Sequence, residues 1–105
     1  RRIRQHDGTD ISAHPGTPVR ATAKGVVKFS GYEGYYGNLV VIDHGNGMQT
    51  WYAHLSRRNV KQGEAVPREA IIGAVGSTGR STGPHLHYEV RVNGKPVDAE
   101  KYLTD

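Results

Sequence analysis

The stretch Ser81-Thr82-Gly83-Pro84-His85-Leu86-His87-Tyr88-Glu89-Val90 contains two histidines separated by one residue, followed by an alternating apolar and polar run. In a β-strand, side chains at positions i and i+2 project from the same face of the sheet. The alternation therefore predicts a strand with an apolar face that packs into a core and a polar face. The apolar face would hold Leu86, Tyr88 and Val90, and the polar face His85, His87, Glu89 and Arg91.

A same-face pair of histidines has two interpretations. It can be two half-exposed side chains with no chemical role, or part of a metal site, because neutral imidazole is a common ligand for zinc. The spacing does not choose between His85 and His87 as a ligand, since both could reach one ion. The rest of the chain has to decide between these interpretations.

Length and composition limit the choices. The 105 residues fit one domain spanning residues 1–105, which we expect to be part of a longer chain. The sequence contains no cysteine, so a metal site would have to use histidine and carboxylate, and disulfides are excluded. No apolar run is long enough to cross a bilayer, and no signal peptide is present in the sequence.

The net charge of +4 favours an anionic partner, either nucleic acid or an anionic cell envelope. The basic residues are scattered apart from two short clusters, and no basic helix or base-stacking motif is present. The sequence therefore does not favour nucleic-acid binding.

Three further residues are candidates for chemistry. His6 and Asp10 are separated by four residues, but Gly8 and the following Pro15-Gly16 argue against a helix, so this segment is predicted to be extended or irregular. Its simplest interpretation is a polar loop. His54 ends a predicted strand over residues 48–55, in which Met48, Thr50, Tyr52 and His54 would share one face. A structural role for His54 is equally open.

The pattern of short strands and turns predicts an all-β fold, a compact sandwich or barrel, because no segment has a sustained helical period. Asn-Gly pairs predict hairpins at residues 44–47 and 93–94, and residues 31–37 read as a Tyr/Gly loop that could form the wall of a groove. The pattern of glycine, two residues and valine at 16–19 recurs at 63–66, which is a weak sign of internal duplication. Further strands are expected within residues 19–23, 26–30, 38–43, 60–66 and 71–76, with one helical turn at 98–103.

Three motifs in order resemble those of the LytM/lysostaphin-type zinc metallopeptidases, a family of peptidoglycan endopeptidases. They are His6…Asp10, Tyr52-Ala53-His54-Leu55 and His85-Leu86-His87. Framework turns such as Asp43-His44-Gly45-Asn46-Gly47 also match, and the resemblance covers the chain from His6 to Leu103. The resemblance implies a duplicated sandwich with a metal at the floor of a groove.

Carried over to this sequence, the resemblance implies one zinc ion per chain, bound by His6, Asp10 and His87. His85 and His54 would then be catalytic residues beside the metal, with His85 as the candidate general base. His54 would share that task or stabilise the tetrahedral intermediate, and the sequence does not separate the two roles. Asn38, Arg80 and Tyr35 are candidate substrate-binding residues, with turn stabilisation as the alternative for the first two.

The expected function is therefore zinc-dependent hydrolysis of peptide cross-links or stem peptides of peptidoglycan, by a monomer acting outside the cytoplasm. One alternative is a non-catalytic LytM-type module that binds the cell wall or activates other wall hydrolases. A second is a carbohydrate- or nucleic-acid-binding β domain with incidental histidines.

Overall fold

The computed structural model describes residues 2–4, 8–81 and 83–99. These residues form ten β-strands and, within the described part of the chain, no α-helix. The strands are β1 (Arg2–Arg4), β2 (Thr9–Ser12), β3 (Pro18–Arg20), β4 (Gly25–Glu33), β5 (Gly37–Gly45), β6 (Met48–Arg58), β7 (Ala65–Val66), β8 (Ile71–Val75), β9 (His85–Val92) and β10 (Lys95–Val97). The prediction of an all-β fold is confirmed.

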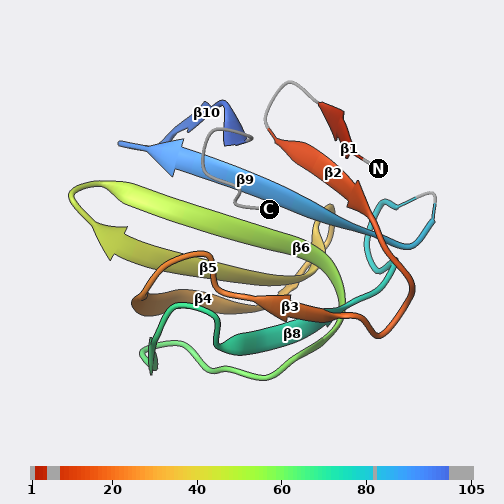
Figure 1. Ribbon diagram of the computed structural model, residues 1–105, viewed down its shortest axis with the longest axis horizontal. Helices are drawn as coiled ribbons and strands as arrows, with labels where there is room; N and C mark the ends of the chain where they lie inside the picture. The colour runs from red at the N-terminus through yellow and green to blue at the C-terminus, as the bar shows by residue number, and fades with distance from the viewer. Residues whose placement is uncertain (1, 5–7, 82, 100–105) are drawn as a thin grey trace.

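The strands form an open antiparallel sheet in the order β1-β2-β9-β6-β5-β4-β7, which is not closed into a barrel (Figure 1). Strand β10 pairs with β9, and β3 pairs with β8. Strand β8 also pairs with the last residues of β6, from Leu55 to Arg58. The long strand β6 thus has β9 as its neighbour over its first half and β8 over its second.

Two clusters of apolar side chains lie on opposite sides of the sheet. The larger cluster contains Val40, Ile42, Tyr52, Tyr88 and Val90 from the main sheet, covered by Val19 of β3 and by Ile72 and Val75 of β8. The smaller cluster contains Leu39, Val41 and Ala53, with Phe29, Tyr36 and Trp51 packed against it. Since Tyr88 and Val90 are buried in the large cluster, the predicted apolar face of the histidine strand is confirmed.

Both predicted Asn-Gly hairpins are present. Asn46 and Gly47 have φ values of 54° and 78°, and Asn93 and Gly94 have 52° and 82°. Positive φ at both central residues is the geometry of a type I′ turn, which matches the twist of the flanking strands. These turns bring β5 onto β6 and β9 onto β10.

Some boundaries differ from the prediction. The predicted loop at 31–37 is only a tight turn at 34–36, because Gly31 to Glu33 continue β4 and pair with residues of β5. The predicted strand at 60–66 is reduced to Ala65–Val66. The helical turn expected at 98–103 falls almost wholly outside the described residues. Among those described, no helix is long and apolar enough to span a membrane.

Candidate functional site

The pairing of β2 with β9 brings Asp10 against the histidine pair. Asp10 is the register partner of His87, and residues directly opposite in an antiparallel pair project from the same face. One carboxylate oxygen of Asp10, Oδ1, lies 2.6 Å from Nδ1 of His87 and 3.7 Å from Nε2 of His85. The predicted same-face arrangement of the two histidines therefore converges on one carboxylate.

His54 joins this cluster through a break in the regular alternation of β6. Asn38 pairs with Leu55 and Val40 with Tyr52, so two residues of β6 oppose one of β5, as in a β-bulge. His54 has a φ of 62°, in the left-handed region. Its ring centroid lies 5.0 Å from that of His85 and 5.9 Å from that of His87.

This geometry corrects the predicted faces of β6. A regular strand would have placed His54 beside Tyr52 and Leu55 on the opposite side. Instead Leu55 is buried in the same cluster as Tyr52, and His54 lies with His85 and His87. The bulge occurs where β6 leaves β9 after Ala53 and begins to pair with β8 at Leu55. The change of partner strand is therefore what turns the imidazole towards the site.

Backbone carbonyl groups hold two of the imidazoles in one orientation. Nδ1 of His54 lies 2.7 Å from the carbonyl oxygen of Thr78, and Nδ1 of His85 lies 2.9 Å from that of Gly83. A carbonyl oxygen can only accept, so the proton of each neutral ring is on Nδ1. In both rings Nε2 is then left with its lone pair, as a general base requires.

His54 is suited to remain neutral. Burial lowers the pKa of its imidazole, and the neighbouring His85 and His87 lower it further, while the hydrogen bond to Thr78 only partly offsets these effects. Its residue surface is 3% exposed. A buried neutral imidazole beside two others can accept a proton at neutral pH without being already charged.

His87 is held on both sides by carboxylates. Its Nδ1 faces Asp10 and its Nε2 lies 2.8 Å from Oε2 of Glu89. Burial lowers the pKa of His87, but the hydrogen bonds and charges of Glu89 and Asp10 outweigh it and raise the pKa overall. In the metal-free chain this imidazole therefore holds a proton more firmly than an ordinary histidine.

Glu89 itself is fully buried and is paired with Arg91. Its Oε1 accepts a hydrogen bond from Nε of Arg91 at 2.9 Å and forms an ion pair with Nη2 of the same guanidinium at 2.8 Å. Burial by itself would raise the pKa of Glu89, but the bonds from His87 and Arg91 lower it overall, so the carboxylate stays charged. The guanidinium carbon of Arg91 lies 3.8 Å from the centre of the Trp51 ring.

The donor types at this site fit a zinc ion. Nδ1 of His87 and Oδ1 of Asp10 are directed at one another, and imidazole nitrogen with carboxylate oxygen is a common zinc ligand set. The third predicted ligand, His6, lies outside the described residues. Within the described part of the chain, no three histidine or acidic side chains form a complete metal site.

The three predicted substrate-binding residues differ in how available their side chains are. The Asn38 side chain donates to the carbonyl of Leu55 at 3.0 Å and accepts from Nε of Arg58 at 3.2 Å, so its polar atoms are engaged within the fold. Arg80 is exposed and lines a shallow hollow with Tyr35, Gly79 and Ser81. The Tyr35 side chain is 54% exposed and is available to a ligand.

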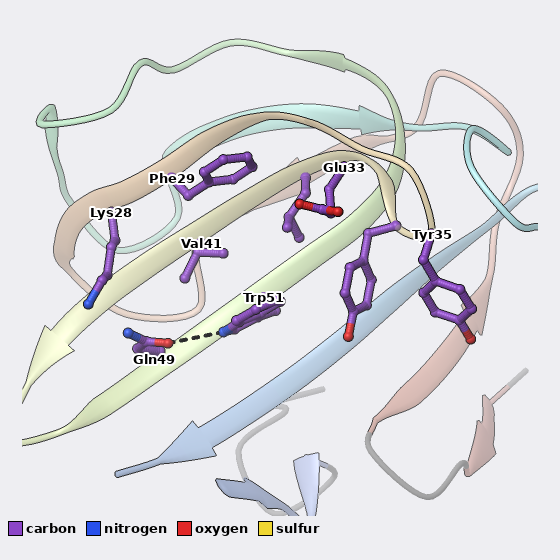
Figure 2. A pocket seen from close by; sticks show the side chains of 9 residues that line it. Lys28, Phe29, Glu33, Tyr35, Val41, Gln49 and Trp51 are labelled. Carbon is purple, nitrogen blue, oxygen red and sulfur yellow. Dashed lines mark hydrogen bonds between the residues drawn. The ribbon is translucent and has the colours of Figure 1, made fainter. Parts of the chain in front are cut away.

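A pocket of about 310 Å³ lies on the same side of the sheet as His87. Figure 2 shows Phe29, Val41 and Trp51 over strands β4, β5 and β6, with Tyr35 at one end and Lys28 near Gln49 at the other. The pocket is also lined by Tyr36, whose ring centroid lies 6.0 Å from that of His87. The pocket therefore borders the histidine cluster.

Sequence reasoning placed Glu89 and Arg91 on the histidine face without giving them a role, and it did not single out Trp51 or Tyr36. The signal for the first two was the alternation itself, which continues past His87 with a carboxylate and then a guanidinium. Trp51 and Tyr36 had no such signal, because their contacts with Arg91 depend on pairing between distant strands.

Comparison with known proteins extends these observations. The model of Peptidase family M23 matches residues 4–99. The DD-carboxypeptidase/endopeptidase Mpg of Neisseria meningitidis is 59% identical over 95 residues, which cover 90% of this chain and 22% of that protein. Peptidoglycan DD-endopeptidase ShyA of Vibrio cholerae is 50% identical over 101 residues, covering 96% of this chain and 24% of that protein. The chain thus spans less than a quarter of the length of these relatives.

Solved structures show the same fold. The catalytic domain of lysostaphin from Staphylococcus simulans superposes with a TM-score of 0.87 at 38% identity, covering 93% of this chain and 78% of that one. A zinc-containing peptidase from Vibrio cholerae superposes with a TM-score of 0.87 at 44% identity, covering 95% of this chain and 30% of that one. The resemblance to lysostaphin-type metallopeptidases is confirmed, and the chain belongs to peptidase family M23.

Proposed function

We propose that this chain is the catalytic part of a zinc-dependent endopeptidase that hydrolyses peptide cross-links or stem peptides of bacterial peptidoglycan. The observation that carries the proposal is the convergence of His54, His85 and His87 with Asp10, from three strands that are distant in sequence. A purely structural histidine would not require two further imidazoles within ring contact.

The relatives support the choice of substrate. The Neisseria protein is named a DD-carboxypeptidase/endopeptidase and the Vibrio protein a peptidoglycan DD-endopeptidase. A structural neighbour is described as containing zinc. We propose one zinc ion per chain, held by His87 through Nδ1, by Asp10 and by His6.

Zinc, when bound, supplies a Lewis acid that polarises a carbonyl group and increases the acidity of water. The tasks of the protein are then to remove a proton from the attacking water and to stabilise the developing oxyanion. Nε2 of His85 carries a lone pair and lies 3.7 Å from Oδ1 of Asp10, beside the proposed ligands, so we assign His85 as the general base.

His54 presents the same free nitrogen from the other side. Because its ring is buried and neutral, it can take up a proton during the reaction and then donate a hydrogen bond to the tetrahedral intermediate. It could equally share the role of base with His85. The substrate peptide would lie in front of these rings, with Tyr35 and Arg80 as contacts and Asn38 as a support for the wall.

Two substitutions test the assignment. His85→Ala removes the base but leaves the ligands, so we expect the protein to bind one zinc ion and to release no peptides from purified sacculi. His87→Ala removes a ligand, so we expect zinc to be lost, as measured by metal analysis after dialysis. If His85→Ala lost zinc while His87→Ala retained it, the ligand assignment would be wrong.

The unmodified protein tests the reaction itself. Incubation with purified sacculi and zinc should produce new amino termini and soluble muropeptides, which mass spectrometry identifies. Zinc binding without any release of peptide would favour a non-catalytic module that activates other hydrolases. Salt-dependent oligonucleotide binding without zinc would favour the nucleic-acid alternative.

We also propose that the protein acts outside the cytoplasm, where peptidoglycan is found, and as a monomer. The net charge of +4 would favour retention on an anionic envelope, so release from sacculi should increase with salt. Sedimentation at micromolar concentration tests the oligomeric state.

A further inference from the structure

The carboxylate of Glu89 is the second partner of the imidazole to which we assign zinc binding. It is 0% exposed, and both of its oxygens are used: Oε2 faces Nε2 of His87 at 2.8 Å, and Oε1 accepts a hydrogen bond from Nε of Arg91 and lies 2.8 Å from its Nη2. A buried charge of this kind is costly unless it is fully paired. Its place beside His87 therefore needs a reason.

The chemistry of the pair determines which nitrogen of His87 is protonated. An ionised carboxylate can only accept hydrogen bonds, so Nε2 of His87 must donate to Glu89. Nδ1 of His87 lies 2.6 Å from a second carboxylate oxygen, Oδ1 of Asp10, so without a metal this contact needs a proton as well. A zinc ion bound to Nδ1 would replace that proton, and the neutral ring would then keep its one N–H on Nε2, facing Glu89.

We propose that Glu89 is a positioning residue that selects the metal-binding tautomer of His87. This inference rests on the proposed function only in taking His87 as the zinc ligand. Glu89 acts through His87, and no part of it needs to contact the ion or the substrate.

Arg91 holds Glu89 in the required place. Its Nε and Nη2 both lie against Oε1 of Glu89, at 2.9 and 2.8 Å, and its guanidinium carbon lies 3.8 Å from the centre of the Trp51 ring. Nη2 of Arg91 also donates to the hydroxyl of Tyr36 at 3.2 Å. Trp51 and Tyr36 line the pocket of Figure 2, so one buried ion pair joins the wall of this pocket to the zinc ligand.

Replacement of Glu89 by glutamine separates positioning from simple filling of space. Glutamine keeps the shape of the side chain, but Arg91 requires an acceptor and will take its amide oxygen. The amide NH2 then faces Nε2 of His87 and can only donate to it. The proton of His87 moves to Nδ1, which is the nitrogen that should bind zinc.

The first measurement is zinc affinity by competition with a chromophoric chelator. We expect E89Q to bind zinc about 10- to 100-fold more weakly than the unchanged protein, the usual effect of losing such a partner of a ligand. The matched control is Glu64→Gln, because the Glu64 side chain is exposed and accepts a hydrogen bond from the backbone N–H of Lys61, on a different part of the fold. Equal zinc affinity in E89Q and the unchanged protein, with both folded, would overturn the proposal.

The second measurement needs no variant and so does not depend on whether E89Q folds. Long-range ¹H–¹⁵N spectra of the zinc-loaded protein report which nitrogen of His87 is protonated. We expect one proton, on Nε2, with zinc bound through Nδ1. A proton on Nδ1 in the zinc-loaded, unchanged protein would overturn the proposal.

These results are independent of hydrolysis. Failure to cleave peptidoglycan would count against the proposed function while leaving the zinc affinity and the tautomer as measured. Loss of zinc affinity in E89Q together with an unchanged tautomer would contradict tautomer selection, because the loss would then come from altered packing.

Discussion

The left-handed backbone of His54 can be tested by comparing two truncations at that position. His54→Ala and His54→Gly both remove the imidazole and its hydrogen bond to Thr78, and they differ by one methyl group. Alanine at this site must keep the φ of 62° that histidine has, whereas glycine adopts it freely. The difference in stability between the two variants therefore isolates the backbone contribution.

The expected difference follows from two opposing effects. A left-handed conformation costs an L-residue about 1–2 kcal/mol. In an ordinary strand, glycine gives a free energy of unfolding about 0.5–1 kcal/mol lower than alanine does, because the unfolded chain is more flexible at glycine. Subtracting the midpoints of these ranges leaves about 0.75 kcal/mol in favour of the glycine variant, which corresponds to a melting temperature about 3–6 °C higher in a domain of this size.

Urea denaturation of the chelated variants measures this difference, and both variants should fail to release peptides from sacculi. The control is Ala53→Gly at the preceding residue, which is buried and does not have a positive φ. There glycine should destabilise the protein, so the sign of the alanine-to-glycine change should reverse between two adjacent positions. The strained bulge would be refuted if replacing alanine by glycine lowered the free energy of unfolding at position 54 by as much as it does at position 53.

Three further predictions concern the same site. A Cβ atom added at Gly8 would lie 2.7 Å from the Tyr88 carbonyl oxygen and 2.9 Å from Cε1 of His87. Gly8→Ala should therefore lower the free energy of unfolding, measured by urea denaturation, by about 1–3 kcal/mol and should weaken zinc binding. Gly34→Ala is the control, because a Cβ atom there meets open space and should have neither effect. The pKa of Glu89 is lower in the folded chain than in the unfolded one, so its contribution to stability is present above its unfolded pKa, about 4.5, and is lost as the pH falls through the folded value. Denaturation of the chelated protein between pH 6 and pH 3 should show this loss, and a profile equally steep in E89Q would contradict it. Zinc at a free concentration of 100 times its dissociation constant should add about 2.7 kcal/mol to the free energy of unfolding, and an unchanged midpoint would argue against a site in the folded state.

Several features of the protein follow from local sequence alone. The alternation around His85 and His87 predicted their common face and the buried face of Tyr88 and Val90, because a strand has a period of two wherever it lies. The Asn-Gly pairs predicted both hairpins, because the turn geometry is a property of those residues. Motif order was sufficient to indicate the family.

Other features depended on which strands pair. The face of His54 could not be read from the alternation of β6, because the bulge that reverses it occurs where β6 exchanges β9 for β8. The approach of Asp10 to His87 is likewise a matter of register between β2 and β9. The same holds for the contact of Arg91 with Trp51, which joins β9 to β6.

The sequence by itself thus determined the all-β class, most of the strands, the Asn-Gly turns and the residue types available for chemistry. Only the tertiary structure decided which groups face the nitrogens of each imidazole: a carbonyl at Nδ1 of His54 and of His85, and carboxylates on both sides of His87. Those acceptors are supplied through turns and strand pairing, and a period of two contains no information about the register or partner of a strand.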